Sequence, residues 1–419
     1  MRKRDISPSD RYGRDPRVTV VVGLTLLVLA TPASATVYVA TWTGPGLDTD
    51  PNPETNCWTT SVWDVKWWNS HLDEVPVKEQ IELIPVKDIS RWRRILYTGV
   101  DPVTGHRIDV VYVPGGWRPE EHWGSDWDDL LRWAQLHLGI GYVGICAGAT
   151  TFIRAFPCVW SVDGLKGHAL PEVLLLPHPA NPLVQEGESR VIRMYYANGP
   201  GMEWKRGWYT IKYYIDKKLH KIKAYCDVQG VMKYLEHVKG WAYVAGRWIV
   251  DGVEKGRFVV MSVHPEIMGR KDKDPDMVQT FIYAILWAAK RLPSGWKIHL
   301  TLDKTLVGVG EAVKVVLRLV NSVGAPIADF SPIWVKVVGP EGEEEHVLKT
   351  NEEGKATLTV VPESEGLYRI EASAVDVQAT GSFSVGIPPV PFPVVTGVLI
   401  AAILGIVVTP RRVRQSSQG

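Results

Sequence analysis

The sequence contains little cysteine and no excess of charge of either sign. Four of its 419 residues are cysteine, and no two of them form a C-x-x-C pair, so neither a disulfide scaffold nor a cysteine-rich zinc module is expected. The 47 basic and 46 acidic side chains give a formal net charge of +1, which excludes the basic surplus typical of nucleic-acid-binding proteins. The length then predicts two or more ordinary globular domains.

Charged residues are missing altogether from two apolar runs near the ends of the chain. Residues 18–30 follow several basic residues and precede Ala33-Ser34-Ala35, which predicts a secretory signal peptide over residues 1–35; an uncleaved membrane anchor is the alternative. Residues 390–409 are long enough to span a bilayer, and the basic segment 410–419 follows them. The sequence therefore predicts a single-pass protein of the cell membrane, with the bulk of the chain outside the cytoplasm.

Strands and helices alternate over the first part of the expected mature chain, which is typical of a parallel α/β sheet. The strands are predicted at 36–42, 80–86 and 107–113, and the helices at 57–72, 125–137 and 275–291, with Ser125 as the cap of the second helix. Residues 170–176, 190–196 and 208–215 are predicted as mostly antiparallel insertions, and residues 241–244 are expected to pair with 257–263. Ligands of such sheets bind at the carboxyl ends of the parallel strands.

One of these strand ends carries a cysteine between two glycines, in Gly144-Ile145-Cys146-Ala147-Gly148. Glycines on both sides of a nucleophile allow a strand to turn sharply into a helix. The N–H of Ala147 and the helix N-terminus would then face the sulfur and favour a thiolate and an oxyanion. A buried structural cysteine at a strand–helix junction is the alternative interpretation.

A second strand is followed by His264-Pro265-Glu266. A histidine at such a position can take the proton of a thiol and later protonate a leaving group, and a nearby carboxylate can hold the tautomer of the imidazole. A surface loop without chemistry is the alternative for this short motif.

Together these segments resemble the class I glutamine amidotransferase-like superfamily, and most closely its biotin–protein ligase N-terminal domain family. The resemblance covers residues 36–292 and is carried, in the family's order, by residues 114–116, 144–149, 196–200 and 256–266. It implies a flavodoxin-like sandwich with Cys146 as nucleophile, His264 as base and Glu266 as orienting acid. It further implies an oxyanion hole or substrate-binding site formed by Gly115, Gly116, Ala147 and Asn198.

The sequence departs from the family's pattern at two positions after the expected turn. Thr150 stands where glutamine-hydrolysing members place a glutamine, which disfavours glutamine as substrate. Ala147 stands where the related peptidase-like branch places a histidine, which disfavours that branch. No synthetase or ligase domain and no Gly-Arg-Gly biotin-binding motif follows, so biotin ligation is not expected.

Tryptophan is abundant, with 18 residues, and three of them follow Gly116 closely. Trp117, Trp123 and Trp127 can wall an apolar or sugar-stacking subsite, but ordinary packing under a loop is the favoured interpretation. Of the other cysteines (Cys57, Cys158 and Cys226), two can form a disulfide outside the cytoplasm, and the pairing is not readable from the sequence. The histidines lack the spacing of metal ligands, so no metal and no cofactor is expected.

A domain boundary is predicted near residues 293–295. Beyond it, short alternating strands at 297–302, 312–321, 334–338, 356–361 and 366–374 are separated by polar turns. This pattern predicts an all-β sandwich over 296–387, and it resembles extracellular immunoglobulin-like modules. We expect this module to space the first domain from the membrane or to bind a partner protein at the cell surface.

Two classes of function follow from these patterns. The first is a membrane-tethered cysteine-dependent amidase or hydrolase that acts by acyl transfer on a small-molecule or peptide amide. The second is a non-catalytic binding or scaffold domain that retains the fold. The presence of the turn, the glycine loop and the His-Pro-Glu motif favours the enzyme.

Overall fold

The computed structural model describes residues 36–47, 52–162, 167–236, 238–272, 274–322 and 324–386. The predicted signal peptide (1–35), transmembrane helix (390–409) and basic tail (410–419) lie outside these residues. Within the described part of the chain, no helix has both the length and the apolar character that a bilayer span requires.

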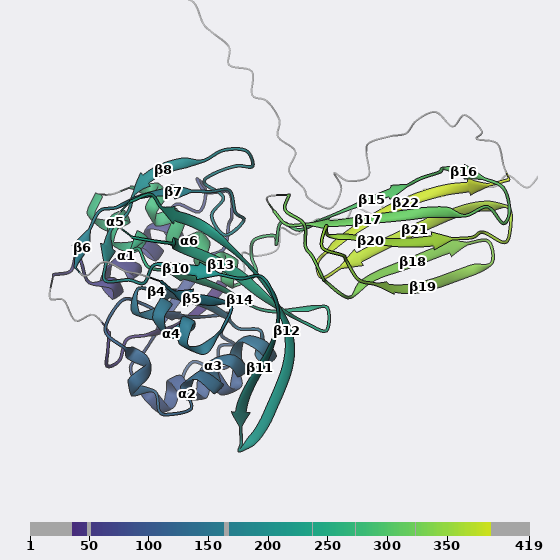
Figure 1. The fold of residues 1–419 in the computed structure, drawn as a ribbon. Helices are drawn as coiled ribbons and strands as arrows, with labels where there is room; N and C mark the ends of the chain where they lie inside the picture. The colour runs from purple at the N-terminus through teal and green to yellow at the C-terminus, as the bar shows by residue number, and fades with distance from the viewer. Residues whose placement is uncertain are drawn as a thin grey trace, which may run out of the picture. The chain divides into compact units, whose positions relative to one another are not determined.

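Five neighbouring parallel strands form one end of a large mixed sheet (Figure 1). They are β1 (Thr36–Trp42), β2 (Gln80–Val86), β3 (Val110–Val113), β4 (Gly141–Ile145) and β14 (Val253–Met261). Their order is β2-β1-β3-β4-β14, and each neighbouring pair is parallel. This is the flavodoxin-like order, in which the chain first moves to one side of β1 and then to the other. The predicted parallel α/β sheet is therefore confirmed.

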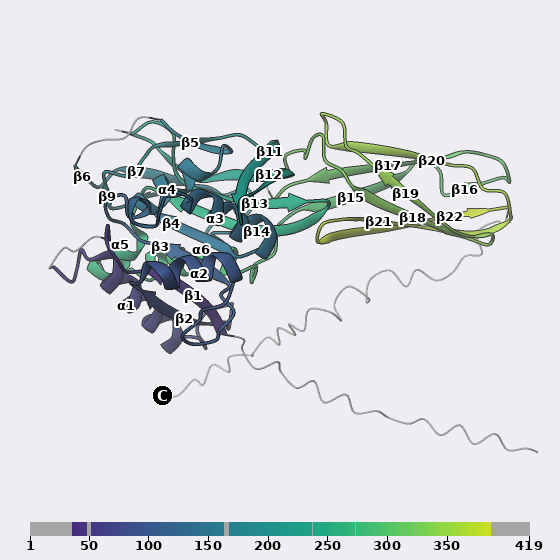
Figure 2. The ribbon, with the colours of Figure 1, turned by 90° about the horizontal axis from the view of Figure 1, so that it is seen from below.

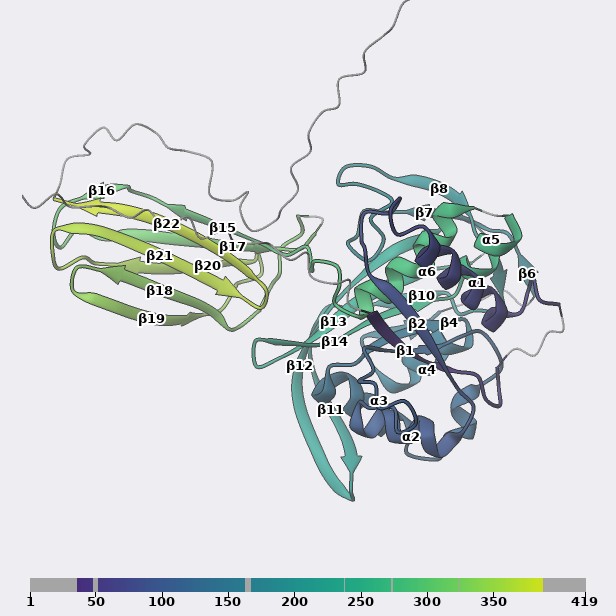
Figure 3. The same ribbon diagram turned by 180° about the vertical axis from the view of Figure 1, so that it is seen from behind.

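Helices cover both faces of the parallel strands, as Figure 3 shows from behind. One face carries α1 (Cys57–Ser70), α5 (Pro265–Asp272) and α6 (Pro275–Ala288); the other carries α2 (Ile89–Thr98), α3 (Trp127–Trp133) and α4 (Ala147–Ala155). The two cores are built from alternate residues of each strand. In β1, Val37 and Val39 belong to the first core, whereas Ala40 and Trp42 belong to the second. Alternation of this kind is what a strand buried on both sides requires.

Antiparallel strands extend the sheet beyond β14. The order continues with β13 (Trp241–Val250), β12 (Lys218–Tyr234), β7 (Glu172–Leu175) and β8 (Arg190–Arg193). Two branches leave this order. In one, β11 (Gly207–Ile215) pairs with β12, and in the other β10 (Met202–Trp204) pairs with both β13 and β5 (Val159–Ser161). A separate two-stranded sheet pairs β6 (His168–Ala169) with β9 (Tyr196–Ala197). The predicted antiparallel insertions are thus present, although the 17-residue strand β12 was not predicted.

The predicted helix over 125–137 differs from the structure at both ends. Helix α3 begins at Trp127 and its cap position is Asp126, which makes no side-chain capping hydrogen bond, so the predicted cap at Ser125 is wrong. From Ala134 to Leu138 the helix widens into a π-helical turn, and Gly139 ends it with φ 70°. A short 3₁₀ turn, Pro119–His122, lies between β3 and α3. Helix α2 was not predicted, although Asp88 caps it by accepting a hydrogen bond from Arg91 N at 2.6 Å.

The C-terminal part forms two antiparallel-rich sheets, whose strands run alongside one another in Figure 2. The smaller sheet has the order β15-β17-β20 and the larger one β16-β22-β21-β18-β19. The strands are β15 (Lys297–Leu302), β16 (Leu306–Val307), β17 (Val313–Val320), β18 (Ile333–Gly339), β19 (Gly342–Leu348), β20 (Lys355–Val360), β21 (Gly366–Ala374) and β22 (Val377–Val385). Inward residues of both sheets, such as Leu317 and Ile370, share one core. The five predicted strands are present, and β16, β19 and β22 are additional.

Candidate active site

Cys146 lies between β4 and α4, in a backbone conformation that residues other than glycine rarely adopt. Its φ of 53° and ψ of −104° place it outside the ordinary helical and extended regions. Strain of this kind persists only where the surrounding structure holds it, and it concentrates at functional sites. The structure therefore contains the sharp strand-to-helix turn that the sequence predicts.

The two glycines beside Cys146 are required by close backbone approaches. A Cβ on Gly144 would lie 2.5 Å from the carbonyl oxygen of Gly148, and one on Gly148 would lie 2.1 Å from the carbonyl oxygen of Val113. Both distances are too short for any side chain, because the contacted atoms belong to the backbone. The spacing of the Gly-x-Cys-x-Gly motif is thus explained by how tightly α4 approaches β3 and β4.

The thiol of Cys146 is nearly buried, with 8% of the residue exposed. Its backbone N–H donates to Met261 O at 2.7 Å, which ties the turn to the end of β14. Its Sγ donates to Ala197 O at 3.1 Å. The predicted segment 196–200 is therefore adjacent to the sulfur.

His264 and Glu266 follow the end of β14, the strand next to β4 in the sheet. The His264 N–H donates to Tyr195 O at 2.8 Å, which positions the residue just beyond β14. Its Nδ1 lies 2.9 Å from Oε1 of Glu266, in the first turn of α5, and the two residues are 2% and 0% exposed. A carboxylate at Nδ1 favours the tautomer that carries its proton there and leaves Nε2 free to accept one.

The pKa of His264 is determined by burial, by Glu266 and by the thiols of Cys57 and Cys146. Burial alone lowers the pKa of His264, but the charge of Glu266 and the thiols of Cys57 and Cys146 outweigh burial and raise this pKa well above its usual value. Glu266 and Cys57 both contact Nδ1. The other ring nitrogen, Nε2, is buried and has no hydrogen-bond partner among the described residues. In this conformation the Cys146 thiol is turned toward Ala197 O, and catalytic hydrogen bonds often tighten only when substrate binds.

Cys57 is a member of this cluster that the sequence analysis did not identify. Its Sγ lies 3.7 Å from Nδ1 of His264, and burial raises the pKa of its thiol to about 12. The residue begins α1, after Asn56 has capped that helix through Thr59 N. Only its place in the fold reveals it, because 207 residues separate it from His264.

Gly115 closes the space between Cys57 and the imidazole. A Cβ at this position would lie 2.8 Å from Cys57 Sγ and 2.8 Å from Cε1 of His264. The glycine after Pro114 is therefore needed for the ring to fit.

A cavity of about 170 Å³ opens beside the sulfur of Cys146. Its lining residues are Gly116, Trp117, Arg118, Glu120, Cys146, Ala147, Thr150, Ala197 and Asn198. Three of the four predicted oxyanion-hole or substrate-binding residues, Gly116, Ala147 and Asn198, thus line the same cavity as Cys146. Asn198 has φ 55°, and its side-chain oxygen accepts a hydrogen bond from Gly167 N at 2.5 Å.

Glu120 is a second residue that the sequence analysis missed. It is 1% exposed, and its carboxylate accepts a hydrogen bond from Thr151 Oγ1 at 2.9 Å and forms an ion pair with Arg154. A buried carboxylate compensated in this way supplies a fixed polar wall to the cavity.

The three tryptophans after Gly116 divide between the two predicted roles. Trp117 is 74% exposed and lines the cavity. Trp123 and Trp127 are buried, and Trp123 packs against Trp42 with ring centroids 5.6 Å apart. Packing explains the latter two, whereas Trp117 is placed to contact a ligand.

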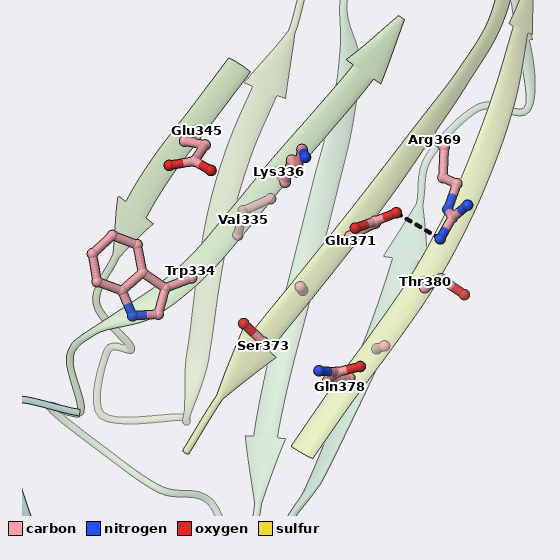
Figure 4. Close-up of a pocket in the computed structure, with 11 residues that line it drawn as sticks. Trp334, Val335, Lys336, Glu345, Arg369, Glu371, Ser373, Gln378 and Thr380 are labelled. Carbon is pink, nitrogen blue, oxygen red and sulfur yellow. Dashed lines mark ion pairs between the residues drawn. The ribbon is translucent and has the colours of Figure 1, made fainter. Parts of the chain in front are cut away.

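A second hollow, of about 300 Å³, lies on the outer face of the larger sheet of the C-terminal sandwich (Figure 4). It is lined by Trp334, which is 51% exposed, and by polar residues that include an ion pair of 2.6 Å between Arg369 and Glu371. Its lining contains no cysteine, histidine or strained residue. Of these two hollows, only the smaller one is lined by a cysteine in a strained backbone conformation, Cys146.

Comparisons with known proteins find no matching family model and no matching curated protein. Among solved structures, the chain is similar to a glutamine amidotransferase from Thermotoga maritima, with 12% identity, a TM-score of 0.34, and coverage of 60% of this chain and 97% of that one. It is also similar to a Thermoplasma acidophilum protein assigned to GMP synthase, with 14% identity, a TM-score of 0.31, and coverage of 59% and 95%. The Lin-41 filamin domain matches 22% of this chain and 92% of its own, with 16% identity and a TM-score of 0.19. TM-scores this low assign neither residues nor a reaction, so our account of the fold rests on the strand order given above.

Proposed function

We propose that residues 36–292 form a class I glutamine amidotransferase-like domain that hydrolyses amides by acyl transfer through Cys146. The observation that carries the proposal is the strained turn at Cys146, which holds a thiol between an open cavity and the buried His264–Glu266 pair. A merely structural cysteine needs neither the unfavourable backbone conformation nor the imidazole.

In the first half of the proposed reaction, Nε2 of His264 takes the proton of the Cys146 thiol, and the sulfur attacks the amide carbonyl carbon. Glu266 stabilises the resulting imidazolium through Nδ1–H. The N–H groups of Gly116 and Ala147, which line the cavity, would stabilise the negative oxygen of the tetrahedral intermediate.

In the second half, the imidazolium returns its proton to the leaving amine as the C–N bond breaks, which leaves a thioester on Cys146. Water then attacks the thioester carbonyl with His264 as base. The products are a carboxylic acid and an amine, and the thiol is regenerated.

The chemistry of the cavity restricts the substrate. About 170 Å³ accommodates a small acyl group, with Trp117 as an exposed aromatic wall and Asn198 and Thr150 as polar neighbours. We propose a small-molecule or peptide amide as the substrate, outside the cytoplasm, with the protein held at the cell membrane by residues 390–409. We further propose that the C-terminal sandwich is an immunoglobulin-like spacer or a binding module for a protein at the cell surface.

The test is to trap the thioester on the full-length protein. The protein is incubated with a library of small amides and peptides, quenched in acid and digested, and the Cys146 peptide is analysed by mass spectrometry. We expect an acyl adduct on Cys146 in the wild type and none in Cys146→Ser, with Cys158→Ser as a matched control that keeps the adduct. The proposal would be refuted if amine is released without an adduct on Cys146, or if the release does not depend on Cys146.

One observation favours a second candidate, a binding domain without catalysis. Cys146 Sγ donates to Ala197 O, and Nε2 of His264 lacks a hydrogen-bond partner among the described residues, so the two are not engaged in this conformation. The binding candidate predicts that a cavity ligand binds equally well to the wild type and to Cys146→Ser, and that it is recovered unchanged.

A further inference from the structure

Three potential metal ligands from two distant segments meet beneath the proposed active site. Cys57 Sγ, a ring nitrogen of His264 and a carboxylate oxygen of Glu266 all lie within 4.8 Å of one another. The three residues are 1%, 2% and 0% exposed, respectively. Thiolate, imidazole and carboxylate are the ligand types that zinc uses in proteins.

The separations suit a tetrahedral zinc ion. Bonds of about 2.3 Å to sulfur and 2.1 Å to nitrogen place these two ligand atoms roughly 3.6 Å apart, and Cys57 Sγ lies 3.7 Å from His264 Nδ1. Nδ1 and Glu266 Oε1 are 2.9 Å apart and would need to separate by a few tenths of an ångström. The sulfur–nitrogen separation therefore matches a tetrahedral site, and all three ligand atoms lie within 4.8 Å of one another.

Buried carboxylate oxygens without a hydrogen bond lie at and near this cluster. Oε2 of Glu266 has no hydrogen-bond partner in the described residues, and neither has either oxygen of Asp64, which is 0% exposed. Asp64 is close enough to Glu266 for their charges to act on each other, and Arg270 acts on Asp64 with the opposite sign. Buried polar groups without partners are rare in proteins, and a bound cation would satisfy these.

We propose that Cys57, His264 and Glu266 form an inhibitory Zn²⁺ site that silences Cys146 when it is filled. The inference rests on the proposed function and adds a regulation to it. A thiolate in the ligand set selects zinc over magnesium or calcium. Cys146 is not a ligand in this arrangement, because the ligand atoms that gather here belong to Cys57, His264 and Glu266.

Inhibition follows from the protonation of the imidazole. When zinc binds Nδ1, Glu266 no longer accepts a hydrogen bond from Nδ1–H, and the neutral ring carries its proton on Nε2. Nε2 then donates and cannot take the proton of Cys146. Binding also releases the proton of the Cys57 thiol to solvent, since the thiolate is the ligand.

The test measures metal binding directly on the full-length protein, so that it does not depend on a substrate. Because the ligands are buried, Zn²⁺ or Co²⁺ is added in two ways: to the folded protein, and during refolding. Unbound metal is then removed, and the metal content of the protein is measured. We expect one ion per chain and a thiolate-to-cobalt charge-transfer band in the wild type. Cys57→Ser should lose the band and bind at least about tenfold more weakly, whereas Cys146→Ser, the matched control, should keep both.

Each outcome decides the inference separately from the proposed function. The zinc site is overturned if no ion is bound after refolding, or if Cys57→Ser binds zinc as well as the wild type does. If circular dichroism shows that Cys57→Ser does not fold, Glu266→Gln serves as the second ligand variant. Zinc binding, combined with no acyl adduct on Cys146 in the zinc-free protein, overturns the proposed hydrolase and the inhibitory role but leaves the metal site. An adduct that forms equally fast with zinc bound overturns the inhibition alone.

Discussion

Oε1 of Glu266 lies 2.9 Å from Nδ1 of His264, and both side chains are almost completely buried. An ion pair shielded from water in this way is much stronger than one on the surface. It fixes the imidazole in one orientation, with Nε2 directed away from the carboxylate. Most of the predictions below depend on this pair.

We expect Glu266→Gln to slow alkylation of Cys146 at neutral pH. The carboxylate charge raises the pKa of His264, and an imidazolium beside the thiol favours the thiolate. Without that charge the imidazole is a weaker proton acceptor, so the pH–rate profile of labelling should shift to higher pH and the rate at pH 7 should fall roughly tenfold. The pH–rate profile of Cys146 labelling measures the shift, and Glu343→Gln, on an exposed strand of the sandwich, is the control. Superimposable profiles would refute the role of Glu266.

We expect Gly115→Ala to impair Cys146 while leaving the fold intact. The added methyl group would meet Cys57 Sγ and His264 Cε1 at 2.8 Å, so the imidazole must shift. Overpacking of this size costs about 1–3 kcal/mol of stability, and the displaced ring should slow labelling of Cys146 severalfold. Gly308→Ala is the matched control, because the nearest atom to its added methyl group would be Glu311 Oε2 at 4.0 Å, an ordinary contact. Unchanged labelling in a stably folded Gly115→Ala protein would contradict the contact.

Trp117 and Trp123 should respond in opposite ways to truncation. Trp117 is 74% exposed beside the cavity, so Trp117→Ala should leave the melting temperature almost unchanged and weaken binding of any cavity ligand. Trp123 is 1% exposed and packs against Trp42 and Trp92, so Trp123→Ala should cost about 3–5 kcal/mol. Thermal unfolding of the two variants checks the contrast, and equal destabilisation would show that Trp117 is a packing residue.

Because His178 is buried, the folded protein should lose stability as the pH falls from neutral to mildly acidic values. Burial lowers the pKa of this histidine to about 3, and its Nδ1 accepts a hydrogen bond from Ala180 N at 3.0 Å. The unfolded chain takes up a proton below about pH 6.5, whereas the folded chain does not until about pH 3. Stability is therefore lost as the pH falls through this window, at up to about 1.4 kcal/mol per pH unit.

The comparison with His178→Asn isolates this effect, because an asparagine oxygen can accept the same hydrogen bond without titrating. Between pH 7 and pH 5 the wild type should lose about 2 kcal/mol more than the variant in urea unfolding. Parallel losses in the two proteins would show that His178 does not contribute.

Local chemistry in the sequence predicted the centre of the fold and three residues of the site. Strand β1 and strand β2 have their predicted bounds, because their apolar residues face a helix layer on each side. Cys146 was found because glycines must flank so tight a turn, and His264 because a strand ends just before it. The sequence also predicted the pairing of β13 with β14.

Features that depend on distant contacts were missed. Cys57 and Glu120 look like ordinary residues of a helix start and a loop, and only the folded chain places them against His264 and beside Cys146. Strand β12 was not predicted because lysines alternate along its first half, and that half pairs with β11. Ser125 was expected to cap a helix that in fact begins later, at Trp127, after Asp126.

The central claim, that His264 activates Cys146, is tested most directly by competitive alkylation of the four thiols in the folded, full-length protein. All four cysteines are free, and Cys146 is the most exposed of them at 8%. Peptide mass spectrometry after timed exposure to iodoacetamide at pH 7 gives each rate, in the wild type and in His264→Ala. The account predicts that Cys146 reacts first and that its rate falls at least about tenfold in the variant, while the rates of Cys158 and Cys226, which do not contact His264, stay the same. If Cys146 reacts equally fast in both proteins, it is a structural thiol and the proposed hydrolase is wrong.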